Sequence, residues 1–161
     1  MNTYHTVHRV PFAMDDMFAL VADIEAYPQF VPLCEALTVR RRERHGHHEV
    51  LVADMTAAYK FVRETFTSRV SIDREAGEIL VEYIDGPFRH MENRWRFHAA
   101  GEGACDVDFF IAYEFRSHAL QLLMGALFDK AFRKFVDAFE ERARLIHGNW
   151  RERSRQDLTA P

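Results

Sequence analysis

One long amphipathic segment near the end of the chain, residues 118–147, constrains the fold more than any other feature. Its apolar side chains recur at the spacing of one helix face and form a wide stripe. As a single helix it would be about 45 Å long, at about 1.5 Å per residue. A stripe of this size needs a broad apolar partner surface. Its members are Leu120, Leu123, Met124, Leu127, Phe128, Ala131, Phe132, Phe135, Val136 and Phe139.

Six segments with strand character lie before this helix and can supply the surface. Short polar or glycine-bearing breaks such as Gly86-Pro87 separate them, which is typical of an antiparallel meander. Apolar and charged residues alternate within them, so one face of the sheet is expected to be apolar and the other solvated. The segments are Glu35–Arg44, His48–Tyr59, Phe61–Asp73, Glu78–Asp85, Phe88–Ala99 and Cys105–Phe115.

The chain before the meander predicts one more strand and two short helices. Residues 3–10 alternate weakly and are expected to form the first strand. Ala13–Glu25 has its apolar residues near one side and is expected to be helical. Pro28 and Pro32 follow closely and allow at most a single further helical turn before the sheet begins.

The composition fits one ordered domain. The 161 residues are 48% hydrophobic and include 14 Phe, which is enough for a substantial core. The predicted domain covers residues 1–147, and the polar remainder, 148–161, is expected to be disordered. The net charge of −4 gives no bulk electrostatic reason to bind nucleic acid, and DNA is not an expected partner.

Three further features predict a cytoplasmic protein. Cys34 and Cys105 form no CxxC pair and fit a reduced compartment. The first residues lack the basic and apolar regions of a signal peptide. The longest apolar run, Leu122–Phe128, is far too short to span a bilayer. Contact with a membrane from the outside is the alternative that these features leave open.

Three stretches carry a resemblance to a known family: residues 18–34 (FALVADIEAYPQFVPLC), the DGPF run at 85–88 followed by Trp95-Arg96-Phe97, and the helix Phe128–Ala143. Together they resemble the coenzyme-Q-binding START-like family. This family belongs to the polyketide cyclase/dehydrase and lipid-transport superfamily and is related to the ribosome-association toxin branch. The resemblance covers roughly residues 3–146. It implies an α+β helix-grip fold (START/Bet v 1-like), with an antiparallel sheet of about seven strands wrapped around the long C-terminal helix.

The resemblance also implies a function. Proteins of this kind bind ubiquinone (coenzyme Q) or a related isoprenoid lipid in a hydrophobic cavity. They act as a carrier or chaperone that supports respiratory electron transport, without a known catalytic step. Ubiquinone would then be a bound ligand rather than a cofactor, and the protein could touch the inner membrane surface. Two alternatives are a cyclase or dehydratase acting on an apolar substrate, and a toxin-type protein that associates with the ribosome and blocks subunit association.

The candidate ligand-binding residues are apolar or amphipathic side chains expected around such a cavity. They are Tyr27, Phe30, Leu33, Met55, Tyr59, Glu64, Phe66, Met91, Trp95, Phe109, Tyr113, Leu120, Met124, Phe128, Ala131 and Phe135. No catalytic residue and no metal ligand is assigned, since no catalytic or phosphate-binding motif occurs. His45, His47 and His48 lie on a tight glycine turn and are expected to be solvated.

Two features near the expected cavity have more than one interpretation. The proline-stiffened segment Tyr27–Cys34 is either a hydrophobic plug or a gate over the cavity. Gly125, inside the long helix, indicates close packing, a bend, or space for a ligand. For Cys34 a packed thiol is favoured over a reactive one, because no activating His or helix N-terminus is evident nearby.

Period-two alternation places three polar residues, Glu64, Ser68 and Asn93, on the apolar face. A buried Glu must be paired, hydrogen-bonded or neutral. Glu64 is therefore a candidate for contact with a quinone head group or for a catalytic acid/base. A bulge or a slipped register that turns it to solvent is the alternative.

Four arginines, Arg40, Arg41, Arg42 and Arg44, form a basic strand edge. Such a run is usually a solvated face. It is also the one local feature that could meet anionic lipid or ribosomal RNA.

Overall fold

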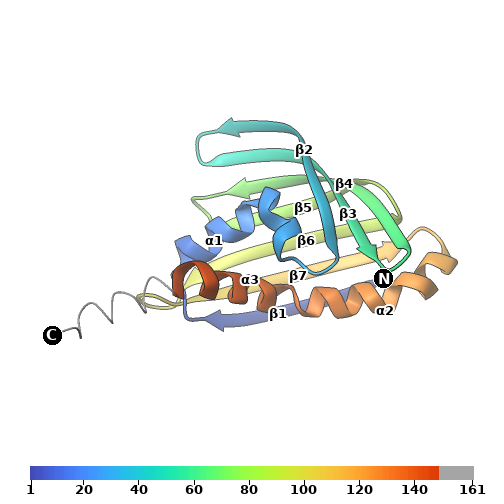
Figure 1. Cartoon of the computed structure of the whole chain (residues 1–161). Helices are drawn as coiled ribbons and strands as arrows, with labels where there is room; N and C mark the ends of the chain where they lie inside the picture. Colours follow the sequence, from blue (N-terminus) through green and yellow to red (C-terminus); the bar gives the residue numbers. More distant parts are fainter. Residues whose placement is uncertain (149–161) are drawn as a thin grey trace.

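The computed structural model describes residues 1–148 and contains one antiparallel sheet with helices along its concave face (Figure 1). The strand order is β1-β7-β6-β5-β4-β3-β2, so consecutive strands from β2 to β7 are neighbours and β1 closes on β7. The strands are β1 (Asn2–Val10), β2 (Cys34–His45), β3 (His48–Tyr59), β4 (Val62–Asp73), β5 (Glu78–Asp85), β6 (Phe88–Ala99) and β7 (Cys105–Phe115).

The alternation in the sequence produces the two faces of this sheet. In β7, Val107, Phe109 and Ile111 are buried. Asp106 and Asp108, which alternate with them, accept hydrogen bonds on the outer face from Arg9, at 2.9 Å, and His5, at 2.7 Å. The apolar residues of the other strands share the buried face, as the sequence predicts.

Two short helices follow β1, as predicted. Helix α1 (Met14–Ala22) has Asp15 and Asp16 in its first turn, where acidic groups favour the positive end of the helix. It buries its apolar side against β6 and α3 (Phe135–Ala143). The 3₁₀ helix η1 (Ile24–Gln29) contains Pro28 and leads directly to the first residues of β2.

The prediction of one continuous C-terminal helix is wrong. Helix α2 (His118–Arg133) ends at Lys134, and α3 (Phe135–Ala143) follows, with a final π-helical turn over Arg144–Gly148. At the break the Lys134 N–H donates to the carbonyl of Ala131, three residues earlier, at 3.0 Å. The two helices on either side of the break have different neighbours: α2 lies along β7 and β1, whereas α3 contacts α1 (Figure 1).

The predicted α+β helix-grip arrangement is confirmed, with seven strands and the C-terminal helices on the apolar face. The predicted tail of residues 148–161 lies, apart from Gly148, outside the described residues. Among residues 1–148, no helix is both long enough and apolar enough to cross a membrane.

Candidate ligand cavity

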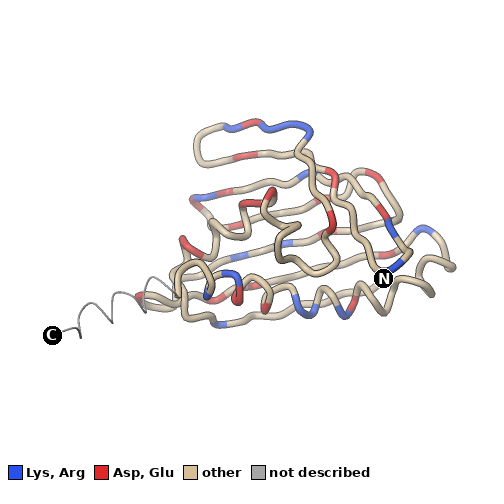
Figure 2. The backbone as a smooth tube through the Cα atoms, in the orientation of Figure 1, with Lys and Arg blue, Asp and Glu red and all other residues tan. Residues whose placement is uncertain are grey.

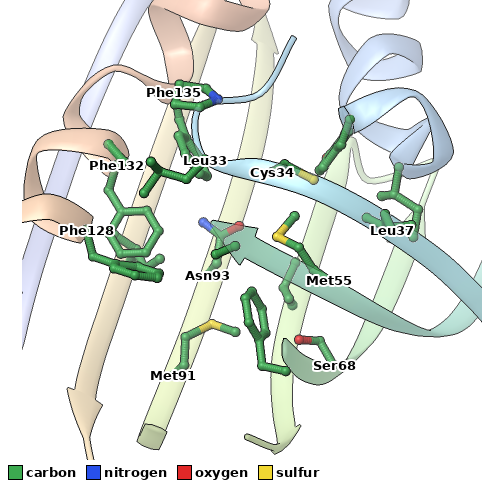
Figure 3. A pocket seen from close by; sticks show the side chains of 18 of the residues that line it. Leu33, Cys34, Leu37, Met55, Ser68, Met91, Asn93, Phe128, Phe132 and Phe135 are labelled. Atoms are coloured by element: carbon green, nitrogen blue, oxygen red, sulfur yellow. The ribbon is translucent and has the colours of Figure 1, made fainter. Parts of the chain in front are cut away.

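A cavity of about 90 Å³ lies between the sheet and the elements that cover it. Strands β3 to β7 form its floor, the segment from η1 into β2 forms one wall, and α2 and α3 form the other (Figure 3). None of its lining residues carries an acidic or basic side chain. The arrangement therefore favours an apolar guest.

Nine of the predicted ligand-binding residues meet at this cavity. They come from every wall, which is why no single strand or helix reveals the site. These residues are Tyr27, Leu33, Met55, Phe66, Met91, Trp95, Phe128, Ala131 and Phe135. That they bind a ligand stays a prediction.

Seven predicted residues lie elsewhere. Phe109, Tyr113 and Met124 are buried in the filled part of the core, and Leu120 packs against that core from its edge. The Tyr59 ring is 46% exposed and carries the Lys60 ammonium 5.3 Å from its centroid. Phe30 packs edge-on against Phe139, 5.0 Å between centroids, instead of facing the cavity.

Glu64, the seventh, is partly exposed and does not line the cavity. It lies in β4 before Thr67, the first residue of that strand to pair with β5. The neighbouring strand on that side is therefore missing at Glu64, and water reaches it. Among residues 1–148, none brings a carboxyl group into the cavity lining, which both a Glu64 head-group contact and a Glu64 acid/base require.

The helix glycine has a simple packing explanation. The Gln121 side chain lies over Gly125, and a Cβ built at Gly125 would stand only 2.2 Å from Gln121 Nε2. The buried Tyr113 hydroxyl donates to the Gly125 carbonyl at 3.4 Å. Gly125 thus marks close packing, whereas Ala131, one helical turn and a half further on, borders the cavity.

Sequence reasoning missed a further set of lining residues. Most of them lie on the predicted apolar face, but parity does not tell which part of that face stays unfilled. The additional residues are Ile24, Pro32, Cys34, Leu37, Ala53, Ala57, Ser68, Val70, Val81, Phe88, Asn93, Ile111, Phe132 and Phe139.

The wall formed by Pro32, Leu33 and Cys34 is conformationally strained. Leu33 has φ of 67°, in the left-handed region that non-glycine residues rarely adopt. Its carbonyl accepts a hydrogen bond from the Ala58 N–H of β3, at 2.9 Å, which helps to hold the conformation. Strain of this kind clusters at binding sites and moving segments. The segment borders the cavity, as either a plug or a gate would.

The two titratable side chains of the cavity wall are kept neutral. Burial raises the pKa of the Cys34 thiol to about 11, and the thiol donates weakly to the Ala36 carbonyl at 3.8 Å. Desolvation likewise raises the pKa of the Tyr27 phenol, whose hydroxyl donates to the Val21 carbonyl at 2.5 Å. Cys34 is therefore a packed, protonated thiol at neutral pH.

Two polar residues on the cavity floor differ in how they are satisfied. The Asn93 amide donates to the Phe110 carbonyl at 2.9 Å, and its oxygen accepts from the Trp95 indole N–H at 2.9 Å. Ser68 is 5% exposed, yet its hydroxyl has no hydrogen-bond partner. Both residues lie on the apolar face, as the alternation predicts.

Figure 2 shows basic and acidic residues close together along the edge of β2, and ion pairs neutralise three of its four arginines. Arg40 pairs with Asp54 at 2.6 Å, and Arg42 pairs with Glu25 at 2.5 Å. Arg44 and Arg42 both face the buried carboxylate of Glu49, at 3.4 and 3.5 Å. The three predicted turn histidines are exposed.

One group of possible metal ligands lies outside the cavity, between β1 and α3. Donor atoms of His8, Asp137 and Glu140 lie within 4.8 Å of one another. The Arg144 guanidinium is 3.5 Å from the Glu140 carboxylate and already neutralises part of its charge. None of its three residues lines the cavity.

The sequence is similar to those of known proteins over most of its length. The sequence model of the family described as "Polyketide cyclase / dehydrase and lipid transport" matches residues 10–140. A ribosome association toxin, RatA, of Vibrio cholerae is 32% identical over 139 residues, covering 86% of this chain and 93% of that protein. A mitochondrial coenzyme Q-binding protein COQ10 homolog B of Xenopus laevis is 30% identical over 141 residues, covering 85% of this chain and 56% of that protein.

A solved structure has the same architecture. The 18 kDa protein CC1736 of Caulobacter crescentus superposes with a TM-score of 0.76 at 34% identity, covering 92% of this chain and 99% of that protein.

Proposed function

The chain belongs to the polyketide cyclase / dehydrase and lipid transport family, and from this premise we propose that it binds ubiquinone, or a related isoprenoid lipid, in the cavity. It acts as a carrier or chaperone of that lipid in support of respiratory electron transport. The observation that carries the proposal is the lining itself, which is apolar apart from a few neutral polar groups. Burial of an apolar ligand there is favourable by about 25 cal/mol per Å². The name of the Xenopus laevis relative supports the choice of quinone.

Binding requires the cavity to widen. An engineered apolar cavity of about 150 Å³ holds one benzene molecule, whereas this cavity measures about 90 Å³. Two features of its lining support widening. Met55 and Met91 are flexible and repack at low cost, and the strained Leu33 segment gains freedom when it moves. We therefore assign the Tyr27–Cys34 segment the role of a gate.

The proposed role is binding rather than catalysis. General acid–base chemistry needs a group whose pKa lies near the working pH. The titratable groups of the cavity wall are Tyr27 and Cys34, and burial moves the pKa of each further above neutrality.

A lipid carrier must meet the membrane that holds its ligand. Exposed apolar side chains gather at one end of the sheet: Phe61, 91% exposed, in the β3–β4 turn, and Leu122 and Leu123 near the start of α2. The register brings these elements to the same end, because Tyr59 pairs with Val62 and Phe88 with Phe115. This end is the proposed contact with the inner membrane surface.

Co-flotation with phospholipid vesicles tests this contact. Phe61→Ser is expected to weaken co-flotation, whereas Val7→Ser, an exposed apolar control on β1, is not.

The experiment that tests quinone binding uses Trp95, which borders the cavity. The other tryptophan of the chain is Trp150, so the Trp150→Phe variant leaves Trp95 as the single indole reporter. Titration of this variant with a short-chain ubiquinone is expected to quench its fluorescence saturably at one quinone per chain. Quenching that rises linearly without saturation would speak against a binding site.

Ribosome association is the second candidate, favoured by the names of several relatives of similar identity. Its surface would be the arginine edge of β2. Acidic partners already neutralise Arg40, Arg42 and Arg44 there, which makes the electrostatic attraction to RNA weak. Co-sedimentation with the large ribosomal subunit at low salt tests it, because electrostatic binding is strongest there. Loss of co-sedimentation in an Arg41→Ala/Arg44→Ala variant would support this candidate.

A further inference from the structure

The cavity floor contains one polar atom that the protein itself leaves without a partner. Among residues 1–148, the buried polar side-chain atoms that lack a hydrogen-bond partner are Ser68 Oγ and Arg142 Nε. The Arg142 guanidinium still donates to Gln29 at 2.7 Å and lies over the Phe30 ring. Ser68 Oγ has no such compensation, although the residue is 5% exposed. A buried hydroxyl without a partner is destabilising, so this one requires an explanation.

The backbone around Ser68 positions this hydroxyl. Thr67 pairs with Asp85 and Ser68 pairs with Tyr83, so β5 contains one extra residue, Ile84, opposite this point. A bulge of this kind bends the strand and redirects nearby side chains, and bulges are common beside binding sites. On its other side Ser68 pairs with Ala53, a small residue that also lines the cavity.

The surroundings of Ser68 are otherwise apolar. Figure 3 shows its oxygen on the side that faces Met91, with Leu33 and Phe135 across the cavity. The second polar residue of the floor, Asn93, already uses its amide on Phe110 and its oxygen on Trp95. Among the described lining residues, Ser68 is thus the group whose hydrogen-bonding capacity is wholly unused.

We propose that Ser68 is the head-group contact of the cavity: its hydroxyl hydrogen-bonds an oxygen of the ligand, a quinone carbonyl or ring methoxy group. The ligand class is an apolar chain that ends in a ring bearing such acceptor oxygens. The ring lies on the floor beside Met91, and the chain extends toward Leu33 and Phe135. This inference rests on the proposed function and adds to it the orientation of the ligand and the residue that distinguishes a quinone from a plain hydrocarbon.

The test compares Ser68→Ala with Ser71→Ala in the Trp150→Phe background. Ser71 lies on the same strand but alternates to the opposite face and does not line the cavity. Two probes are used: a short-chain ubiquinone, and the isoprenoid hydrocarbon of the same chain length, measured by its displacement of the quinone. Ser68→Ala is expected to weaken quinone binding about three- to tenfold. It leaves hydrocarbon binding unchanged, and Ser71→Ala changes neither.

The stability of the ligand-free protein gives an independent readout. Removal of an unpartnered hydroxyl leaves the midpoint of urea unfolding equal or higher in Ser68→Ala, because no hydrogen bond is lost. A lower midpoint would overturn the inference, and so would equal loss of quinone and hydrocarbon binding. If the protein with Ser68 intact binds no quinone, the proposed function fails. If it binds quinone and Ser68→Ala binds it equally well, only the head-group contact fails.

Discussion

The apolar face of the sheet contains two regions that are built from the same kinds of residue and packed in opposite ways. Under α1, Met17, Phe18 and Phe97 are buried away from the cavity, and the Phe18 and Phe97 rings meet edge to face at 5.4 Å. Under α2 and the start of α3, residues of the same types surround a cavity. Hydrophobic pattern alone therefore does not decide whether a surface becomes core or binding site.

The difference lies in the backbone. Three irregularities lie at or beside lining residues: the left-handed Leu33, the extra residue Ile84 opposite Ser68, and the helix break at Lys134 before Phe135. The extra residue interrupts the regular pairing of β4 with β5, and the break interrupts the C-terminal helix. By contrast, the filled region under α1 contains the stretch of β6 from Arg96 to Ala99, which pairs with β7 without a register shift. Strained and irregular backbone is typical of sites that open for a ligand.

The largest effect expected from this contrast is on stability, in a matched pair of methionines. Met17 lies in the filled region and Met91 borders the cavity, and both are buried. Met17→Ala leaves a new void among tightly packed neighbours and is expected to cost about 3 kcal/mol of unfolding free energy. Met91→Ala removes fewer packing contacts, because part of this side chain already faces the cavity, and is expected to cost about 2 kcal/mol, the low end for such a change. Urea unfolding of both variants measures the difference. Equal losses would break the distinction between the two regions.

The second largest expected effect is on quinone binding, which should depend on the cavity region alone. Ala131→Phe places a ring in the cavity and is expected to weaken quinone binding at least tenfold, or about 1.4 kcal/mol. Ala126→Phe makes the same change on the exposed side of α2 and serves as the control. Trp95 quenching measures both. Unchanged binding in Ala131→Phe would mean that the ligand lies elsewhere.

The smallest effect concerns the two cysteines, one in each region: Cys34 borders the cavity and Cys105 lies in the filled core. Burial raises the pKa of both thiols to about 11. Alkylation of both is therefore expected to be slow at pH 8 and to accelerate as the pH approaches 11. Bound quinone should slow the reaction of Cys34 and leave that of Cys105 unchanged. Equal protection of both thiols would point to global stabilisation instead of occupancy of the cavity.

The same pKa values give a sign for the pH dependence of stability. Each folded-state pKa lies above the ordinary thiol value of 9.0. Between about pH 9 and 11 the unfolded chain has therefore lost thiol protons that the folded protein retains. The contribution of these thiols is fully present below pH 9 and declines as the pH rises through this window. Cys34→Ser is expected to make the decline shallower.

Much of this architecture follows from sequence, because strand alternation has a fixed period and the strands are joined by short links. One pair of cross-strand neighbours shows what the alternation does not predict. Trp95 and Phe109 face each other across β6 and β7 on the predicted apolar face, but only Trp95 borders the cavity. Alternation assigns a residue to one face of the sheet, but whether that residue borders the cavity depends on how α2 and α3 cover the face. Their placement depends on the helix break at Lys134, and no Pro or Gly at that residue predicts the break.

For the polar residues on the apolar face, the sequence likewise predicts the face but not whether each residue is buried. Alternation places Ser68 and Glu64 on one face of β4, and Ser68 is indeed buried. Glu64 is not, because β5 stops pairing before reaching it. Where a neighbouring strand ends is a property of the pairing register, and a single strand's sequence does not contain it.

Mass spectrometry of lipid extracted from the protein, after purification from a quinone-producing host, tests the central claim most directly. The account predicts ubiquinone or another isoprenoid lipid in the extract of the unsubstituted protein and its depletion from the Ala131→Phe variant purified in parallel. An extract without isoprenoid lipid, from a protein that after delipidation also fails to take up added ubiquinone, would contradict the account.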